Sequence, residues 1–429
     1  MPNTDLSFRS RWNRTLVHDR EGSADLMIRI TASPRPTHTE RSPIDVAFVI
    51  DRSGSMGGQP IEAAKNGVRM AVDHLDHRDR AAVVIYDDVI DVIQALAPVS
   101  PAARRAIGGA LDDVEARGST NLGEGWLVGC RQIAPEPGVH SGHRLRRTIL
   151  LTDGQANVGM VDPAQLAHHA ANLRMLGVTT TTLGFGEHFD EQLLSAMAEG
   201  GGGNFEYIRS PQQLIPFFNR ELGDMLNAVA IGLTLRVTLP EGVRGEVISF
   251  LPHTRHGKTF EITVGELPAG ESVDVLLQVT TRRGNPGDLL PISLDAHWGD
   301  PIADIDRTWS AVPKPLTRAI GSAVDAAKID QEVAEKSALQ RAANAQREAL
   351  NLDRAGRYAE SRARMRDSHQ TLANAPMTDR VRKELAFMDD LASAPVDAVL
   401  SEHAHKRTAS RVSRMGRGRR DREESLSDD

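Results

Sequence analysis

The sequence predicts an α/β fold: a doubly wound, mostly parallel sheet, flanked by a β-sandwich and a C-terminal helical region. Three observations lead to this prediction. Short β-branched runs alternate with amphipathic helical segments from Ile44 to Asn227, strands without helices between them follow, and an Ala-, Glu- and Arg-rich stretch begins after Pro315. Alternating strands and helices are typical of a parallel sheet covered on both faces, whereas strands separated only by turns indicate antiparallel sheets.

The composition excludes several classes of protein. The 429-residue chain is 40% hydrophobic and 25% charged, and its formal net charge of -7 does not favour general nucleic-acid binding. A single cysteine, Cys130, excludes an internal disulfide framework and an all-cysteine metal site. No run approaches the roughly 18 apolar residues that span a bilayer, and the polar first residues lack the apolar core of a signal peptide. We therefore expect a cytoplasmic protein without a membrane span.

The α/β domain is expected over residues 44–227. Its strands are predicted at 47–50, 81–86, 89–95, 148–151, 178–183 and 204–208. Its helices are predicted at 60–75, 101–116, 122–133, 163–176, 190–198 and 211–226. Several of these helices have Pro or Asp in the first turn and Gly beyond the last, which is the usual arrangement at helix ends.

Three further regions flank this domain. Residues 1–43 contain alternating apolar and polar positions, and we expect these strands to join the β-sandwich of residues 228–312. Residues 313–395 are expected to be helical. Residues 396–429 are expected to form a disordered charged tail, because they contain almost no apolar side chains.

Oxygen-bearing side chains gather in three loops of the α/β domain. Asp51, Ser53 and Ser55 follow the apolar strand that begins at Ile44, Thr120 precedes a predicted helix, and Asp153 follows a second strand. Open α/β sheets bind ligands beside the carboxyl ends of their strands. Two carboxylates and three hydroxyls, with no His or Cys, select a hard cation: Mg²⁺ first, and Ca²⁺ or Mn²⁺ next.

Each loop taken alone also has an ordinary structural interpretation. Ser53, Ser55 and Thr120 could cap helices, and Asp153 could lie in a turn after a strand. Their joint appearance, in this order and near these element ends, favours a common site. The Asp87 and Asp88 pair is predicted to be a solvated hairpin turn and not part of the ligand set.

The five positions resemble the metal-ion-dependent adhesion site of von Willebrand factor type A domains, in which an Asp-x-Ser-x-Ser loop, a Thr and an Asp hold the ion. The resemblance implies that the metal ligands are Asp51, Ser53, Ser55, Thr120 and Asp153. It also implies that Asp153 acts mainly through a water molecule. The vacant coordination position would then favour an Asp or Glu carboxylate from a protein partner.

The arrangement of the whole chain is similar to bacterial von Willebrand type A proteins that carry the label of calcium-activated chloride channel homologues. Channel function is not expected here, because the chain has no membrane span to conduct ions. The β-rich flanks also resemble those around the same domain in inter-alpha-trypsin inhibitor heavy chains. Members of the family often work beside AAA+ ATPases or in multiprotein assemblies, so the resemblance implies a partner of this kind.

We expect a metal-dependent protein-interaction scaffold and not an enzyme. One alternative is a metal-dependent phosphoester hydrolase, but such an enzyme would want a second acid two residues after Asp51, and Ser53 stands there. A second alternative is that the Arg-rich tail from Lys406 onward binds RNA or an acidic surface. The glycines near Asp51 have the wrong spacing for a dinucleotide-binding fingerprint.

Overall fold

The computed structural model describes residues 6–35, 41–136, 143–153, 155–186 and 189–392, together with Thr408. The chain forms two compact units. The α/β unit comprises Thr37–Ile231 and Gly299–Ile305, and the sheet-and-helix unit comprises Met1–Pro36, Gly232–Trp298 and Asp306–Asp429. No helix among the described residues is long and apolar enough to cross a membrane. Apart from Thr408, the predicted disordered tail of residues 396–429 lies outside the described residues.

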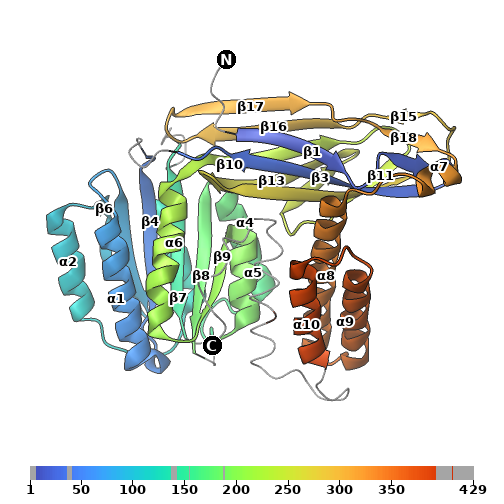
Figure 1. Ribbon diagram of the computed structural model, residues 1–429. Coiled ribbons are helices and arrows are strands. Elements are labelled where there is room, and N and C mark those ends of the chain that lie inside the picture. Colours follow the sequence, from blue (N-terminus) through green and yellow to red (C-terminus); the bar gives the residue numbers. More distant parts are fainter. Residues whose placement is uncertain are drawn as a thin grey trace. The chain divides into compact units, whose positions relative to one another are not determined.

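The α/β unit is built on a six-stranded sheet in the order β6-β5-β4-β7-β8-β9 (Figure 1). The strands are β4 (Ile44–Asp51), β5 (Arg80–Tyr86), β6 (Ile90–Pro98), β7 (Leu145–Thr152), β8 (Val178–Phe185) and β9 (Gly202–Ile208). All neighbouring strands are parallel except the edge pair β5 and β6. Every residue of β4, β7 and β8 is buried, as expected for strands covered on both faces. The predicted doubly wound, mostly parallel sheet is confirmed.

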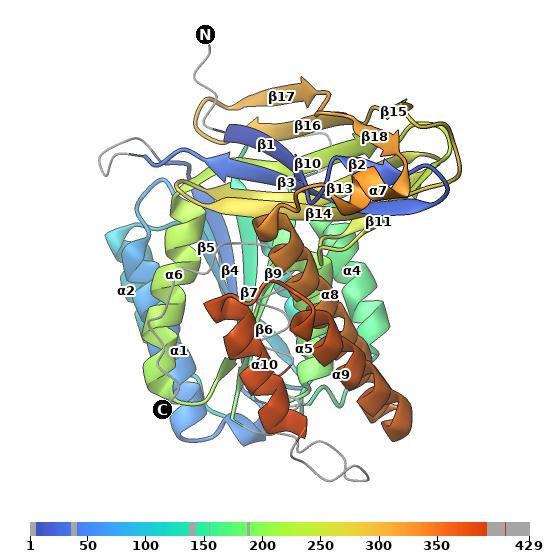
Figure 2. The same ribbon diagram turned by 45° about the vertical axis from the view of Figure 1, so that its right-hand side comes forward.

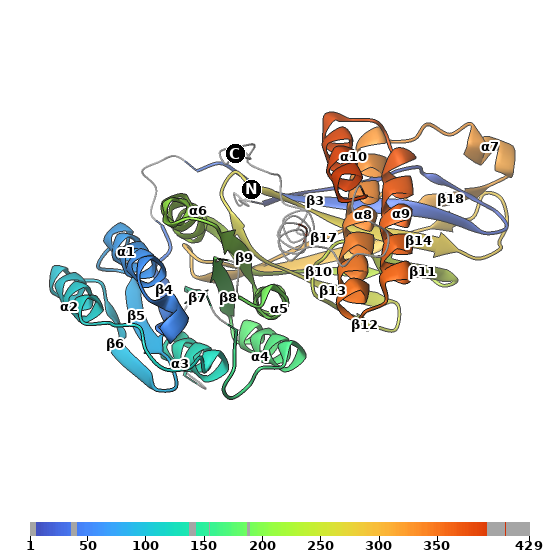
Figure 3. The same ribbon diagram turned by 90° about the horizontal axis from the view of Figure 1, so that it is seen from below.

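Helices cover the two faces of this sheet, as Figure 3 shows. One face carries α1 (Gln59–His74), α2 (Pro101–Asp112) and α6 (Leu214–Leu226), and the other carries α3 (Leu122–Ile133), α4 (Pro163–Met175) and α5 (Glu191–Gly201). Successive residues of β4 serve opposite cores: Val46 and Phe48 lie in the first, Ala47 and Val49 in the second. The period of two along a strand therefore fixes which side chains of β4 point toward α3.

β4 occupies the point where the direction of strand addition reverses. Counted within this sheet, the order of its strands is 3-2-1-4-5-6, so successive strands are first added on the β5 side of β4 and then on its β7 side. Open α/β sheets bind their ligands at such a switch point, beside the carboxyl ends of the strands. The loops that follow β4 and β7 are therefore the expected place for a ligand.

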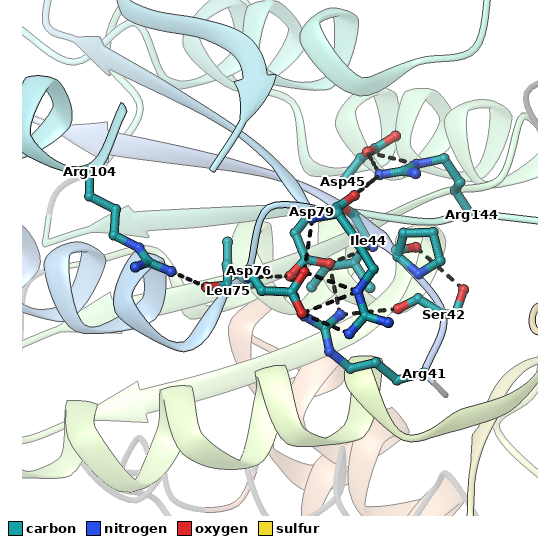
Figure 4. A network of polar contacts seen from close by, with 11 residues as sticks. Arg41, Ser42, Ile44, Asp45, Leu75, Asp76, Asp79, Arg104 and Arg144 are labelled. Atoms are coloured by element: carbon teal, nitrogen blue, oxygen red, sulfur yellow. Dashed lines mark hydrogen bonds and ion pairs between the residues drawn. The ribbon is translucent and has the colours of Figure 1, made fainter. Parts of the chain in front are cut away.

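The opposite end of the sheet is closed by buried ion pairs (Figure 4). Asp79 is fully buried and accepts hydrogen bonds of 2.8 and 2.6 Å from the two terminal nitrogens of Arg41. Asp45, also fully buried, accepts bonds of 2.8 and 2.6 Å from Arg80 and one of 3.0 Å from Arg144. Buried carboxylates need such partners, because leaving one unpaired costs several kcal/mol. These contacts anchor the start of β4.

The sheet-and-helix unit contains three sheets, in the orders β1-β3-β14-β11, β12-β13-β10-β16-β17 and β15-β18-β2. Their strands are β1 (Leu6–Trp12), β2 (Leu16–His18), β3 (Gly22–Ala32), β10 (Ala228–Thr238), β11 (Val243–Val247), β12 (His253–His256), β13 (Thr259–Pro268), β14 (Ser272–Thr281), β15 (Leu289–Leu290), β16 (Ser293–Asp300), β17 (Ile305–Ala311) and β18 (Leu316–Ala319). β3 pairs along most of its length with β14, so the N-terminal strands belong to a sheet whose other members lie far along the chain. The rings of Phe8 in β1 and Trp309 in β17 stack with centroids 4.2 Å apart, which joins the first two sheets.

In the described part of the chain, four helices follow the sheets: α7 (Gly321–Asp325), α8 (Gln331–Arg354), α9 (Tyr358–Ala373) and α10 (Asp379–Ala392). The last three lie side by side (Figure 2). The structure corrects the expected start of the helical region, because Leu316–Ala319 form strand β18, parallel to β2, and the first long helix begins only at Gln331. Strand β12 was not predicted, because all four of its side chains are exposed and give no apolar alternation.

Candidate metal site at the carboxyl edge of the sheet

The two aspartates of the predicted site come from adjacent parallel strands. Asp51 is the last residue of β4 and is fully buried, whereas Asp153 directly follows β7 and is 9% exposed. Both carboxylate oxygens of Asp51 accept hydrogen bonds: Oδ1 from the backbone N–H of Ser53 at 2.7 Å, and Oδ2 from the hydroxyl of Thr152 at 2.5 Å. The Asp51 carboxylate is therefore held in one orientation between its own loop and β7.

The two serines continue this arrangement toward Asp153. Their loop turns through the 3-10 helix η1 (Gly54–Met56), which leaves Ser53 buried and Ser55 exposed. The hydroxyl oxygens of Ser53 and Ser55 lie 3.2 Å apart, and the Ser55 hydroxyl donates to Asp153 Oδ1 at 2.8 Å. Asp51, Ser53, Ser55 and Asp153 thus form one hydrogen-bonded chain that runs from the end of β4 to the end of β7.

Thr120 lies in the adjoining loop. Gly54 N donates to Gly118 O at 3.3 Å, which joins the Thr120 loop to the Asp51 loop. The backbone of Thr120 is fixed from the other side, because its N–H donates to Asn157 Oδ1 at 2.9 Å and its carbonyl accepts from Asn157 N at 3.2 Å. The structure therefore places the Thr120 loop beside the Asp51 loop, and the bonds to Asn157 involve the backbone of Thr120.

Asp87 differs from its predicted role in a solvated turn. It is fully buried and accepts hydrogen bonds from Arg52 at 3.0 Å, from Arg117 at 2.9 Å and from the backbone of Val89 at 2.6 Å. Burial by itself would raise the pKa of Asp87, but these hydrogen bonds, first from Val89 and then from the two arginines, lower it. Its carbonyl also accepts from Asn121 N at 2.9 Å. Asp87 therefore joins the loop after β5 to the Asp51 and Thr120 loops.

Tyr86 lies beneath the site on the strand next to Asp51. The two residues are register partners in the parallel pair β4 and β5, and both are fully buried. No hydrogen-bond partner for the Tyr86 hydroxyl occurs among the residues that the structure describes. Burial raises the pKa of Tyr86 well above its ordinary value, and the nearby charge of Asp51 acts in the same direction. The hydroxyl therefore keeps its proton, and it lies close to Asp51 and Thr152 without a hydrogen bond of regular geometry to either.

The electrostatics of the site favour the binding of a cation. Burial raises the pKa of Asp51 to about 6, although hydrogen bonds from Thr152 and Ser53 oppose this shift and the charge of Asp153 adds to it. A divalent cation beside these groups would favour both ionised carboxylates. The donors are carboxylates and hydroxyls, the ligand type that hard cations prefer, so the residues present fit Mg²⁺. Among the described residues no group of three or more His, Cys, Asp or Glu could hold a metal ion, so the candidate site depends on its hydroxyl groups as well as on its two carboxylates.

Several residues around the site were not identified from the sequence. Thr152 and Asn157 make hydrogen bonds to the candidate ligands, and Arg52 and Asp87 form a buried ion pair behind the first loop. Thr152 is adjacent to Asp153, and Arg52 occupies the second position of the Asp-x-Ser-x-Ser loop, so closeness to the motif was an available signal. Asn157, Asp87 and Tyr86 had no such signal, because their positions depend on how the loops and strands pack.

The sheet order and this edge define an α/β domain that presents a site rich in carboxylates and hydroxyls at its switch point. Residues 45–220 match the family model of the von Willebrand factor type A domain. Residues 45–220 therefore form a von Willebrand factor type A domain, as the resemblance of the motif implied. A domain of this family suggests protein-protein interaction or adhesion.

Relatives are found in bacteria and in animals. An uncharacterized protein of Synechocystis sp. is 28% identical over 300 residues, which cover 67% of this chain and 68% of the relative. The uncharacterized protein YfbK of Escherichia coli is 28% identical over 262 residues, covering 59% of this chain and 44% of YfbK. Human inter-alpha-trypsin inhibitor heavy chain H3 is 30% identical over 162 residues, covering 36% of this chain and 18% of the relative. The chain thus spans less than half of the last two proteins.

Two solved structures resemble the chain over almost its entire length. A von Willebrand factor type A protein from Catenulispora acidiphila has a TM-score of 0.74 at 20% identity, with 96% of this chain and 98% of that chain covered. The ArnB paralog VWA2 from Sulfolobus acidocaldarius has a TM-score of 0.62 at 16% identity, with 95% and 98% covered. At these identities the likeness concerns the fold, and it includes the sheets and helices that flank the domain.

Proposed function

We propose that this protein is a divalent-metal-dependent scaffold that binds an acidic residue of a protein partner. The metal would be held by Asp51, Ser53, Ser55, Thr120 and Asp153. The observation that carries the proposal is the hydrogen-bonded chain of residues from Asp51 through Ser53 and Ser55 to Asp153 at the switch point of the sheet. The domain family, which suggests interaction or adhesion, supports the same conclusion.

The chain's own residues supply orientation at this site. Ser53 N and the Thr152 hydroxyl fix the Asp51 carboxylate, and Ser55 is exposed at the outer side of the loop. A bound Mg²⁺ would supply positive charge toward solvent, where a carboxylate oxygen of a partner could complete its coordination. Asp51 would therefore contact the cation from the buried side of the site, and Ser55 lies on the side that is exposed to solvent.

A hydrolase is less well supported by the same geometry. The position two residues after Asp51 carries Ser53, which has no carboxyl group to serve as a general acid. The intervening Arg52 is 7% exposed and bonded to Asp87 and Asp91, so its guanidinium is not available to a substrate phosphate. Mg²⁺-dependent turnover of a generic aryl phosphate that disappears in Asp51→Ala would reverse this preference; we expect no turnover.

Metal binding is tested first, with Mn²⁺ as a spectroscopic probe for the full chain. Free Mn²⁺ in a titration, measured by electron paramagnetic resonance, should fall with wild-type protein and remain high with Asp51→Asn. Asp73→Asn makes the same change at an exposed position of α1 and should bind like wild type. Absence of Mn²⁺ binding by the wild-type chain would contradict the proposal, as would equal binding by Asp51→Asn.

Partner binding is tested by capture from a cell lysate in Mg²⁺ or in EDTA, with wild type and Asp51→Ala compared. We expect a partner that is captured only by wild type in Mg²⁺ and that is lost when one of its own Asp or Glu residues is changed to Ala. Capture of the same partner in EDTA would contradict the proposal. Salt-sensitive RNA retention, lost on deletion of residues 406–429, would instead support a role for the Arg-rich tail.

A further inference from the structure

Tyr86 has a buried hydroxyl that lacks a hydrogen-bond partner among the described residues. The Tyr86 side chain is fully buried, and no described residue makes a hydrogen bond with its hydroxyl. Leaving a buried polar group unsatisfied destabilises a folded protein, by about 1–3 kcal/mol in general. Phe at this position would keep the ring and avoid that cost. We therefore expect the hydroxyl to have a hydrogen-bond partner in another state of the protein.

The ring is held in place by close packing against α3. A Cβ atom added at Gly125 would lie 2.5 Å from Tyr86 Cγ, so the helix backbone approaches the ring directly. Tyr86 belongs to the apolar cluster on this face of the sheet, together with Trp126 and Val84. The direction of the hydroxyl is therefore fixed by the fold and does not depend on the site.

That direction leads toward the candidate metal site. Tyr86 and Asp51 are register partners in parallel strands, and paired residues of neighbouring strands point to the same face. Thr152, which ends β7 on the other side of Asp51, already donates to Asp51 Oδ2 at 2.5 Å. Each carboxylate oxygen has two lone pairs, so the Asp51 carboxylate retains capacity for a further donor.

We propose that Tyr86 is a positioning residue of the metal site, whose hydroxyl donates to the Asp51 carboxylate when a divalent cation is bound. This inference rests on the proposed function, because it needs a cation at Asp51. In the loaded site, Tyr86 and Thr152 hold the carboxylate from the two neighbouring strands. Hydrogen bonds to an ionised carboxylate are stronger than those between neutral groups, so the donor that is idle without metal gains a partner with it.

The test is Tyr86→Phe in the full chain, with two measurements whose expected changes have opposite signs. In EDTA the variant should unfold at the same temperature as wild type or higher, because an unsatisfied hydroxyl has been removed. Its dissociation constant for Mn²⁺ should rise about tenfold or more, as is typical when an outer-shell hydrogen bond to a ligand is lost. Tyr207→Phe, the same change on β9, should leave Mn²⁺ binding unaltered.

The outcomes separate this inference from the proposed function. If wild type binds Mn²⁺ and Tyr86→Phe binds it equally well, the positioning role is wrong and the metal site stands. Tyr86→Phe could instead unfold in EDTA at a much lower temperature than wild type, with a loss of Mn²⁺ affinity no larger than this loss of stability explains. In that case the hydroxyl has a structural role and the inference is overturned. If wild type binds no Mn²⁺, the proposed function fails and the role of Tyr86 fails with it.

Discussion

Arg52 and Asp87 form a buried ion pair directly behind the candidate ligands, with 3.0 Å between Arg52 Nε and Asp87 Oδ2. Arg52 is the second residue of the Asp-x-Ser-x-Ser loop, and its Nη2 atom donates a hydrogen bond of 2.6 Å to Asp91 Oδ2. Arg117, from the Thr120 loop, donates to the same oxygen of Asp87 at 2.9 Å. One carboxylate therefore fixes two of the loops that carry the candidate ligands.

Replacing Asp87 by Asn should destabilise the α/β unit by about 3–5 kcal/mol, because Arg52 would keep a buried charge with its main partner removed. Mn²⁺ affinity should fall as well, since the loops lose their shared anchor. Urea unfolding and Mn²⁺ titration measure the two effects. Asp88→Asn is the matched control, because Asp88 is the next residue and is exposed. Equal behaviour of the two variants would show that the ion pair does not stabilise the loops.

Gly118 should not tolerate a side chain. Its φ of 69° is in the left-handed region, and a Cβ atom there would lie 2.1 Å from Asp88 Oδ1 and 3.2 Å from Asp87 Cβ. Gly118→Ala should therefore cost about 1–2 kcal/mol of backbone strain and, in addition, displace the Thr120 loop and weaken Mn²⁺ binding.

Gly58→Ala provides the matched comparison for this position. Gly58 has a φ of 83° and a ψ of −126°, a conformation that favours glycine strongly, so Gly58→Ala also carries backbone strain, but a Cβ atom there would meet nothing within 4 Å. The loss of Mn²⁺ binding in Gly118→Ala, compared with Gly58→Ala, therefore reports the clash at Gly118. Gly58→Ala should retain Mn²⁺ binding, and equal losses of binding in both variants would contradict this account.

Glu221 anchors α6 to three strands and should make the α/β unit sensitive to acid. It is fully buried and accepts hydrogen bonds of 2.6 Å from both Arg147 in β7 and Asn204 in β9, and another from Thr181 in β8. Burial would raise the pKa of Glu221, but the charge of Arg147 and these hydrogen bonds lower it.

Because the pKa of Glu221 is lowered by folding, its ionised form stabilises the unit at pH values above the pKa of an unfolded Glu, about 4.3. That stabilisation is lost as the pH falls through the lowered folded pKa. Glu221→Gln should be less stable than wild type by about 3–5 kcal/mol at neutral pH, and the gap should narrow below about pH 4. Urea unfolding from pH 7 to pH 3 measures this difference in the free energy of unfolding, and Glu115→Gln, at an exposed position, is the control. A gap that stays constant with pH would refute the assignment.

Asp274 holds the first turns of α8 on the sheet of its own unit. Its carboxylate is buried, accepts a bond of 2.7 Å from Arg29 in β3 and pairs with Lys336 in α8. Asp274→Asn should speed amide hydrogen exchange in the first half of α8, because two cations lose their common partner. Asp379→Asn breaks an exposed pair with Arg382 on α10 and should change exchange in α8 little. Unchanged exchange in Asp274→Asn would show that apolar contacts alone hold the helix.

The α/β fold was predictable because its signals are local. β4 and β7 are continuous apolar runs, and the helices between strands have caps that their sequences announce, such as Ser100 before α2 and Asp190 before α5. The Asp-x-Ser-x-Ser loop is also local, because its three oxygens lie within five residues. β12 and β18 were missed because their sequences lack an apolar alternation or resemble the helical region that follows.

The sequence by itself determined the strand and helix pattern of the α/β unit and the identity of the five candidate ligands. Only the tertiary structure decided that Asp51 shares a hydrogen bond with Thr152 of a neighbouring strand, that Asp87 is buried between two arginines, and that Tyr86 has a hydroxyl without a partner among the described residues. The physical reason is that burial and pairing of polar groups depend on which strands become neighbours. That order, with β4 between β5 and β7, is set by packing across the whole sheet.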